Sequence, residues 1–117
     1  FSAAVPSEQL KATVVPLELG EHVGIRDLAL LRPGLLLMLS GPAQEQTSIP
    51  YALHTVDMAT GNKLTTLGTL QPVVEGDKPG KAEALLVLAA DADRARVVVL
   101  FDSLPNGGAR EYSVPLR

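Results

Sequence analysis

The chain has 117 residues, 46% of them hydrophobic and only 3% aromatic, which allows one domain with a core of Leu, Val and Ala. Its formal net charge is −3 and its basic residues are scattered, which argues against nucleic-acid binding. The longest apolar run is far shorter than the roughly 20 residues that span a bilayer, so no membrane span is expected. The absence of cysteine excludes disulfides, and it leaves open whether the compartment is periplasmic, extracellular or cytoplasmic.

The first half of the chain predicts strands in close succession. A small, polar arm over 1–10 precedes an extended segment over 12–19, predicted as an edge strand because Pro16 lacks the N–H that a central strand needs. Strands over 25–31 and 35–40 then pair across the turn residues Pro33 and Gly34. A loop over 41–50, a strand over 51–57, a turn over 59–62 and a strand over 64–70 complete a four-stranded antiparallel meander.

The second half repeats this order after a charged loop over 72–79. Strands are predicted over 82–90 and 96–101, joined at 91–95, and a turn at Gly107 and Gly108 leads to a last strand over 110–116. The segment 82–90 also has good helix propensity. We predict a strand there, because the matching segment 25–31 runs directly into a hairpin.

The two halves align as an internal repeat. Gly24 and Asp27 correspond to Gly80 and Glu83, and Ser40 corresponds to Asp102 once the greater length of the second hairpin is allowed for. A repeat of this length in an apolar, strand-rich chain is typical of β-propeller blades. We therefore predict an all-β, antiparallel fold in which 1–117 is a single unit comprising about two propeller blades.

In this prediction residues 24–70 form a full blade and residues 81–116 form three strands of an incomplete one. The segment 12–19 is then the outer strand of a preceding blade or pairs with the incomplete one. Two blades cannot close a ring and leave sheet faces bare. We therefore expect as partners either further N-terminal blades of the same protein or a second copy of the chain.

Four ordered motifs also carry a resemblance: Gly24 to Leu28, Leu37 to Pro42, Lys81 to Leu85, and Val99 to Ser103. In this order they resemble the C-terminal part of an uncharacterised bacterial family, described only as a domain of unknown function. The resemblance covers about residues 20–115. It implies a β-propeller, distantly similar to phytase-like and esterase-like propellers, with the remaining blades N-terminal to this segment. The family has Gly where this chain has Ala84, between Glu83 and Leu85.

Asp27 and Glu83 are the leading site candidates, because both are predicted at the start of inner strands, where propellers bind ligands near their axis. Two carboxylates there can share a cation such as calcium, which takes oxygen ligands. Arg26 and Lys81 lie beside them and can instead neutralise them. We predict a ligand site of Arg26, Asp27, Glu83 and Asp102, with Asp27 and Glu83 as metal ligands. The structural alternative is that the acids hold backbone N–H groups.

Other polar residues point more to structure than to chemistry. Asp91 and Asp93 have the spacing of a calcium loop but lack its further acids and Gly, so a solvated hairpin tip is favoured. His54 lies among apolar neighbours in a strand, whereas His22 lies in a loop and is the better candidate for chemistry. Ser40 is not in a Gly-x-Ser-x-Gly elbow, so no hydrolase nucleophile is indicated.

Three functions remain open from the sequence. The favoured one is a propeller fragment that acts as a binding scaffold for a small ligand, a peptide or a protein. The second is part of a phytase-like or esterase-like hydrolase whose site is completed by further blades. The third is a β module that serves assembly.

Overall fold

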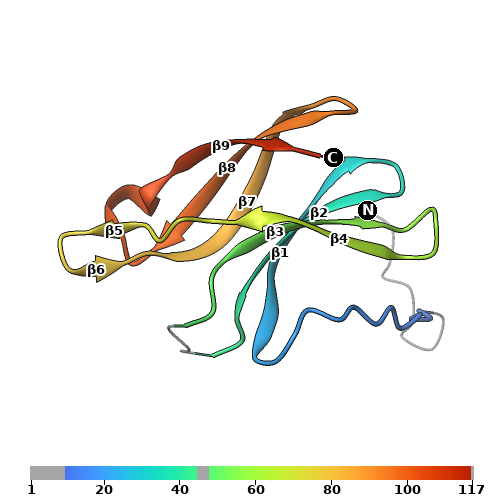
Figure 1. Ribbon diagram of the computed structural model, residues 1–117, viewed down its shortest axis with the longest axis horizontal. Helices are drawn as coiled ribbons and strands as arrows, with labels where there is room; N and C mark the ends of the chain where they lie inside the picture. Colours follow the sequence, from blue (N-terminus) through green and yellow to red (C-terminus); the bar gives the residue numbers. More distant parts are fainter. Residues whose placement is uncertain (1–9, 45–47, 117) are drawn as a thin grey trace, which may run out of the picture.

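The computed structural model describes residues 10–44 and 48–116, and its regular structure is β-strand apart from a short 3₁₀ turn, η2 (Pro105–Gly108) (Figure 1). The first four strands form an antiparallel sheet in the order β1-β2-β3-β4. They are β1 (Val23–Arg32), β2 (Leu35–Pro42), β3 (Ala52–Asp57) and β4 (Lys63–Thr69). The predicted four-stranded meander is thus confirmed.

A second antiparallel sheet has the order β7-β8-β9. Its strands are β7 (Lys81–Ala90), β8 (Arg94–Asp102) and β9 (Arg110–Pro115). The alternative of a helix over 82–90 is therefore wrong. The charged loop that precedes β7 contains a short hairpin of β5 (Val74–Glu75) and β6 (Lys78–Pro79), which projects from one end of the molecule (Figure 1).

The segment 12–19 is not a strand, which corrects the sequence prediction. It has no ladder partner among the described residues, although the half-buried Val15, Leu17 and Leu19 alternate with exposed neighbours as in a strand. Pro16 lacks an N–H group, which weakens any ladder that this segment joins. Apart from Leu10, the predicted N-terminal arm lies outside the described residues.

The two sheets pack face to face around an apolar core, and a second buried apolar group of Met38, Ala52 and Val56 lies on the opposite side of the four-stranded sheet. We call the sides that meet the inner faces and the opposite sides the outer faces. Paired residues share a face, and the inner face of the four-stranded sheet includes Ala29, Leu37, Leu39 and Leu53. The inner face of the three-stranded sheet contributes the following buried side chains: Ala82, Leu85, Ala95, Val97, Val99, Phe101 and Val114. The core is aliphatic except for Phe101, as the composition predicts.

The two sheets approach each other most closely along their first strands, β1 and β7. Each of these strands carries two β-bulges. In β1 the bulged residues are Arg26 and Leu31, and in β7 they are Glu83 and Leu88. The spacing between the two bulges is the same in both strands, so Arg26 corresponds to Glu83 and Leu31 to Leu88.

The bulges change the alignment of the two halves. They make Arg26 the equivalent of Glu83, whereas the sequence alignment gave this place to Asp27. The strands that pair with β1 and β7 shift in the same way. Ser40 pairs with Ile25, and Phe101 pairs with Ala82. Ser40 therefore corresponds to Phe101 rather than to Asp102. A one-residue shift moves every side chain to the opposite face of a sheet. An alignment made on the bulges therefore matches the inner face of one sheet with the outer face of the other.

Turn chemistry explains the different lengths of the two hairpins. Pro33 and Gly34 form a two-residue turn between β1 and β2, and Gly34 has φ +83°, a conformation that favours glycine. Between β7 and β8 the turn is longer, and the Asp91 carboxylate accepts hydrogen bonds from the N–H groups of Asp93 and Arg94. These bonds confirm Asp91 as the residue that builds a hairpin tip. Within the described residues, no helix has the length and apolarity to cross a membrane.

Candidate functional site

Asp27 lies on the seam between the two sheets and contacts both. Its Oδ1 accepts the N–H of Leu28 in its own strand at 2.8 Å, and its Oδ2 accepts the N–H of Leu85 in β7 at 2.7 Å. A carboxylate that accepts two backbone N–H groups forms charge-assisted hydrogen bonds. Asp27 therefore connects the four-stranded sheet to the three-stranded sheet, which is the structural alternative considered for this acid.

Arg26 and Glu83 meet on the same seam because each is the bulged residue of its strand. Arg26 Nη1 lies 3.4 Å from Glu83 Oε1, and both side chains are partly exposed. Tyr51, which directly precedes β3, joins this pair through hydrogen bonds with Arg26 and the Ala82 N–H. Burial raises the pKa of Tyr51, against the opposing effect of Arg26. The predicted basic partner for the acids is thus present, and it binds Glu83.

Asp102, the fourth predicted ligand residue, lies at the end of β8 opposite Lys81. Its Oδ1 accepts the N–H of Ser103, whose φ of +71° places it in a tight turn. Asp102 and Glu83 both line a shallow depression of about 490 Å³ over the outer face of the three-stranded sheet. The predicted set therefore splits into a seam group of Arg26, Asp27 and Glu83, and Asp102 beside it.

The predicted metal ligands Asp27 and Glu83 are engaged with protein groups at the seam. Across the described ranges, His, Cys, Asp and Glu side chains form no group of three or more that could hold a metal ion. His22, the better histidine candidate, is exposed in the turn before β1, has φ +60°, and its carbonyl accepts the N–H of Ala43. Its backbone thus closes the open end of the β1–β2 ladder.

His54 forms a hydrogen-bonded chain across three strands of the four-stranded sheet. Its Nε2 lies 2.7 Å from Ser40 Oγ, and its Nδ1 lies 2.9 Å from Thr66 Oγ1. A serine beside a histidine is the arrangement of an activated nucleophile. However, Ser40 is 2% exposed and His54 is 6% exposed, and neither residue lines the depression beside Asp102. Burial lowers the pKa of His54, which favours the neutral ring with both nitrogens hydrogen-bonded.

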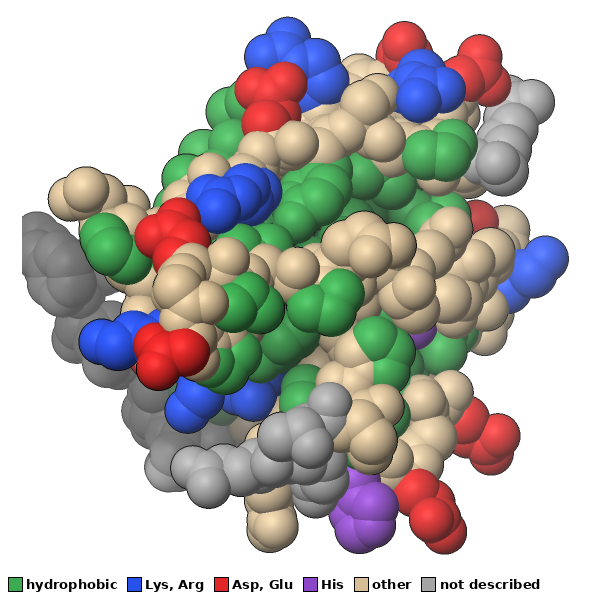
Figure 2. All heavy atoms as spheres, turned by 60° about the vertical axis from the view of Figure 1, so that its left-hand side comes forward, with side chains coloured by type: hydrophobic (Ala, Val, Ile, Leu, Met, Phe, Trp, Pro, Cys, Tyr) green, Lys and Arg blue, Asp and Glu red, His purple; other side chains and the backbone are tan. Residues whose placement is uncertain are grey.

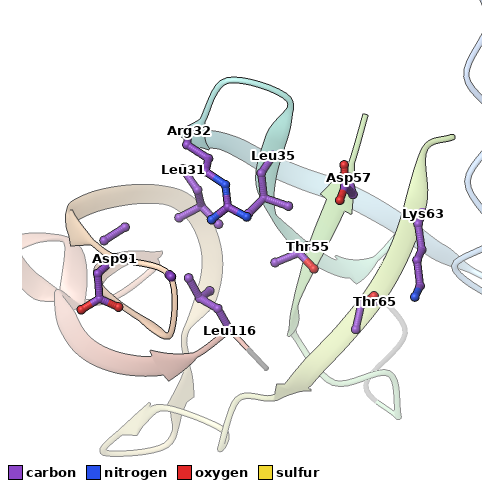
Figure 3. Close-up of a pocket in the computed structure, with 11 residues that line it drawn as sticks. Leu31, Arg32, Leu35, Thr55, Asp57, Lys63, Thr65, Asp91 and Leu116 are labelled. Atoms are coloured by element: carbon purple, nitrogen blue, oxygen red, sulfur yellow. The ribbon is translucent and has the colours of Figure 1, made fainter. Parts of the chain in front are cut away.

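A cleft opens between the two sheets at the other end of β1. It has a volume of about 620 Å³ and includes residues from the β1–β2 hairpin, β3, β4, the β7–β8 turn and the end of the chain. Figure 3 shows the Arg32 guanidinium between Leu31 and Leu35, with Leu116 near it from the end of the chain and the Asp91 carboxylate pointing away from it. We call this the inter-sheet cleft.

The charged residues of the inter-sheet cleft differ in whether they already have partners within the protein. One oxygen of Asp57 accepts the N–H groups of Ala59 and Thr60, and Asp91 holds its own turn in the same way. By contrast, Arg32 and Lys63 form no ion pair with any residue between 10 and 44 or between 48 and 116. The acids therefore build turns, while the two cations have no ion-pair partner in the part of the chain that the structure describes.

Sequence reasoning missed this cleft because its residues come from five separate segments. The sequence predicts only a hairpin tip for Asp91, and it assigns no role to Arg32 or Lys63. The available signal was that both hairpin turns of the predicted repeat carry charged residues and must lie at the same end of the two sheets. Comparison of the chain with protein-family models, with curated proteins and with solved structures gives no match.

Proposed function

We propose that this chain is a pair of blade-like sheets from a β-propeller and acts as a binding scaffold, with its ligand in the inter-sheet cleft. The architecture supports the first part. Each sheet is an antiparallel meander, the sheets meet along their first strands, and both first strands carry the same double bulge. A recurring double bulge is expected of repeated units, because bulges are local features of strand geometry that related units share.

The observation that carries the binding role is the cleft itself. Its volume of about 620 Å³ lies within the range of small-molecule sites. Its wall combines apolar Leu31, Leu35 and Leu116 with two cations that have no carboxylate partner among the described residues. A guanidinium group binds carboxylate and phosphate groups through paired hydrogen bonds. The proposed ligand is therefore a small molecule with an aliphatic body and one anionic group.

A matched set of probes tests this proposal. Hexanoate, hexanol and hexylamine share an aliphatic chain and differ in charge, and their binding can be followed by chemical-shift changes in a ¹⁵N-labelled protein. We expect hexanoate to bind best, with shifts at the β1–β2 and β7–β8 turns. Arg32→Gln should weaken its binding at least tenfold, because a charge-assisted hydrogen bond is worth about 1.5–3 kcal/mol.

The control is Lys78→Gln, which removes one exposed positive charge from the β5–β6 hairpin, outside the cleft. It should leave hexanoate binding unchanged. Equal loss in both variants would mean that only net charge matters, and preferential binding of hexylamine would contradict the proposal.

The hydrolase alternative receives less support from the geometry. Its strongest feature is the pair of Ser40 and His54, and both side chains are buried within the four-stranded sheet. A nucleophile has to meet its substrate, so this pair favours a structural role for the two residues.

A further inference from the structure

We propose that the ligand of the inter-sheet cleft is a hydroxycarboxylic acid. Its carboxylate binds Arg32, and its hydroxyl group, at the other end of an aliphatic chain, binds Thr55 and Thr65. This inference rests on the proposed function and defines its ligand class more closely. It is carried by two threonine side chains that the proposed function leaves unused and by the order of residues across the cleft.

Thr55 and Thr65 form a polar pair in the inter-sheet cleft. They are paired residues of β3 and β4, so their side chains share the inner face of the four-stranded sheet, and both line the cleft. Side chains directly opposite each other in an antiparallel pair have Cβ atoms about 4.5–5.5 Å apart. Two hydroxyl groups at this spacing are both within reach of one small polar group of a ligand.

The hydroxyl group of Thr55 lacks a protein partner. The residue is only 7% exposed, yet its side chain forms no hydrogen bond with any residue in 10–44 or 48–116. The same holds for the exposed Thr65, whereas the next residue, Thr66, is bonded to His54 on the outer face. Buried polar side chains are normally hydrogen-bonded, and an exception calls for an explanation. A polar group of a ligand in the cleft supplies the missing partner.

The order of residues across the sheet defines the shape of the ligand. Arg32 in β1 pairs with Leu35 in β2, and both line the cleft. Figure 3 shows Thr55 between Arg32 and Thr65. Neighbouring strands lie about 4.7–4.9 Å apart, so the backbones of β1 and β3 are about 10 Å apart. From β1 to β4 the cleft thus presents a cation, an aliphatic side chain and two hydroxyl groups, which match a carboxylate, an alkyl chain and a hydroxyl group.

The charges beside the threonine pair favour a neutral group at that end of the ligand. Asp57 is the next inner-face residue of β3 after Thr55, and it lies directly opposite Lys63 in β4. One acid and one base together give little net attraction for a second carboxylate, and the acid repels it at close range. A hydroxyl group both donates and accepts hydrogen bonds without adding charge. A hydroxyl group therefore fits this end of the cleft better than a second carboxylate does.

The experiment has to separate this contact from simple adsorption of an aliphatic chain. Apolar side chains also reach the surface outside the cleft, among them Leu86 (58% exposed) and Leu100 (42% exposed). Figure 2 shows hydrophobic side chains in a broad area bordered by charged ones. Such areas attract apolar ligands of any kind. The informative quantity is therefore the ratio of affinities for two probes that differ only in the hydroxyl group.

The probes are 6-hydroxyhexanoate and heptanoate, which have the same length and differ in a terminal hydroxyl or methyl group. Chemical-shift titration of the ¹⁵N-labelled protein gives both affinities. The wild type should bind 6-hydroxyhexanoate at least as tightly as heptanoate, because the site hydrogen-bonds the hydroxyl group. Thr55→Val replaces the protein hydroxyl by a methyl group of similar size. It should shift the ratio of the two affinities about fivefold toward heptanoate, which is the effect of one neutral hydrogen bond.

Two further variants support this measurement. Thr65→Val changes an exposed position and should shift the ratio in the same direction, so the test does not depend on a substitution in the interior. Thr69→Val is the matched control, because Thr69 is also an exposed residue of β4 but lies outside the cleft. It should leave the ratio unchanged. Circular dichroism of all three variants checks that the sheets remain folded.

The possible failures are distinguishable. An unchanged ratio in both Thr55→Val and Thr65→Val would overturn this inference, as would a wild type that prefers heptanoate. Tighter binding of adipate, which has a second carboxylate in place of the hydroxymethyl group of 6-hydroxyhexanoate, would also overturn it. In these cases the proposed function stands as long as hexanoate binding depends on Arg32. If none of these acids binds in the cleft, the proposed function and this inference are both wrong.

Discussion

At the scale of single residues, Asp27 has the clearest structural consequence, since one carboxylate holds N–H groups from two sheets. Its hydrogen bond to Leu85 joins residues 58 positions apart in sequence, on the strands where the sheets approach most closely. A side chain in this position stabilises the packing of the sheets directly. The pair of Arg26 and Glu83 is more exposed, and we expect it to contribute less.

Asp27→Ala should lower the free energy of unfolding by about 2 kcal/mol, because it leaves two backbone N–H groups without their acceptor. Asp27→Asn keeps one acceptor oxygen and should cost about half as much. Urea denaturation measures both. The losses should be the same in calcium chloride and in EDTA if Asp27 is an anchor. A loss that appears only with calcium would instead show that Asp27 is a metal ligand.

His54 should make stability depend on pH in a defined direction. Burial lowers its pKa below the ordinary value of 6.5, so between these two values the unfolded chain binds a proton that the folded chain does not. The free energy of unfolding should therefore fall as pH decreases below about 6.5, until the lowered pKa is reached.

Urea denaturation over this pH range, with His54→Gln for comparison, checks the assignment. The variant should show a flatter pH dependence, whereas His22→Gln, which changes an exposed histidine, should retain the wild-type slope. If His54→Gln leaves the pH dependence of the free energy of unfolding unchanged, His54 is not the residue responsible for it.

At the scale of elements, the central strands of the four-stranded sheet are held in register by close packing around β2. Gly41 in β2 leaves space for the ring of Tyr51, since a Cβ at this position would come within 2.5 Å of the ring. Gly68 in β4 has no heavy atom within 4 Å of the same position. Neither glycine has a positive φ, so the two differ in space and not in backbone strain.

Gly41→Ala should therefore lower the free energy of unfolding by about 1–3 kcal/mol through overpacking against Tyr51. Gly68→Ala should be neutral or stabilise by up to about 1 kcal/mol, because alanine reduces the freedom of the unfolded chain. Thermal and urea denaturation of both variants measure the difference. Similar stability of the two variants would contradict this account of the β2–β3 packing.

The elements were also what the sequence predicted best. Turn residues and apolar runs located the strands from β1 to β4 and from β7 to β9, because turn chemistry is local. The register of the repeat was not predictable in this way. Strands such as Leu35–Leu39 are apolar at every position, so neither face is marked by polar residues, and a shift of one residue leaves the pattern unchanged.

The candidate site could be predicted only in part, because its contacts also depend on the register of the repeat. Arg26, Asp27 and Glu83 do meet, since they lie on the first strands of both halves. Their individual partners depend on the bulges, which present Arg26 to Glu83 and leave Asp27 to the N–H of Leu85. The inter-sheet cleft depends on how the sheets pack, which no local pattern encodes.

At the scale of the whole molecule, the central feature is that two sheets meet along β1 and β7 and leave the inter-sheet cleft at one end of this contact. The Asp27 carboxylate joins the sheets through the N–H of Leu85. The cleft takes its residues from both sheets, so the proposed ligand site depends on how the sheets pack.

Titration of the ¹⁵N-labelled protein with hexanoate tests this account most directly. A ligand in the inter-sheet cleft should shift the amide signals of the β1–β2 turn and of the β7–β8 turn together, with one shared affinity that Arg32→Gln weakens, because the cleft includes residues from both turns. Shifts at one turn only, or no shifts at either, would contradict a binding site between the two sheets.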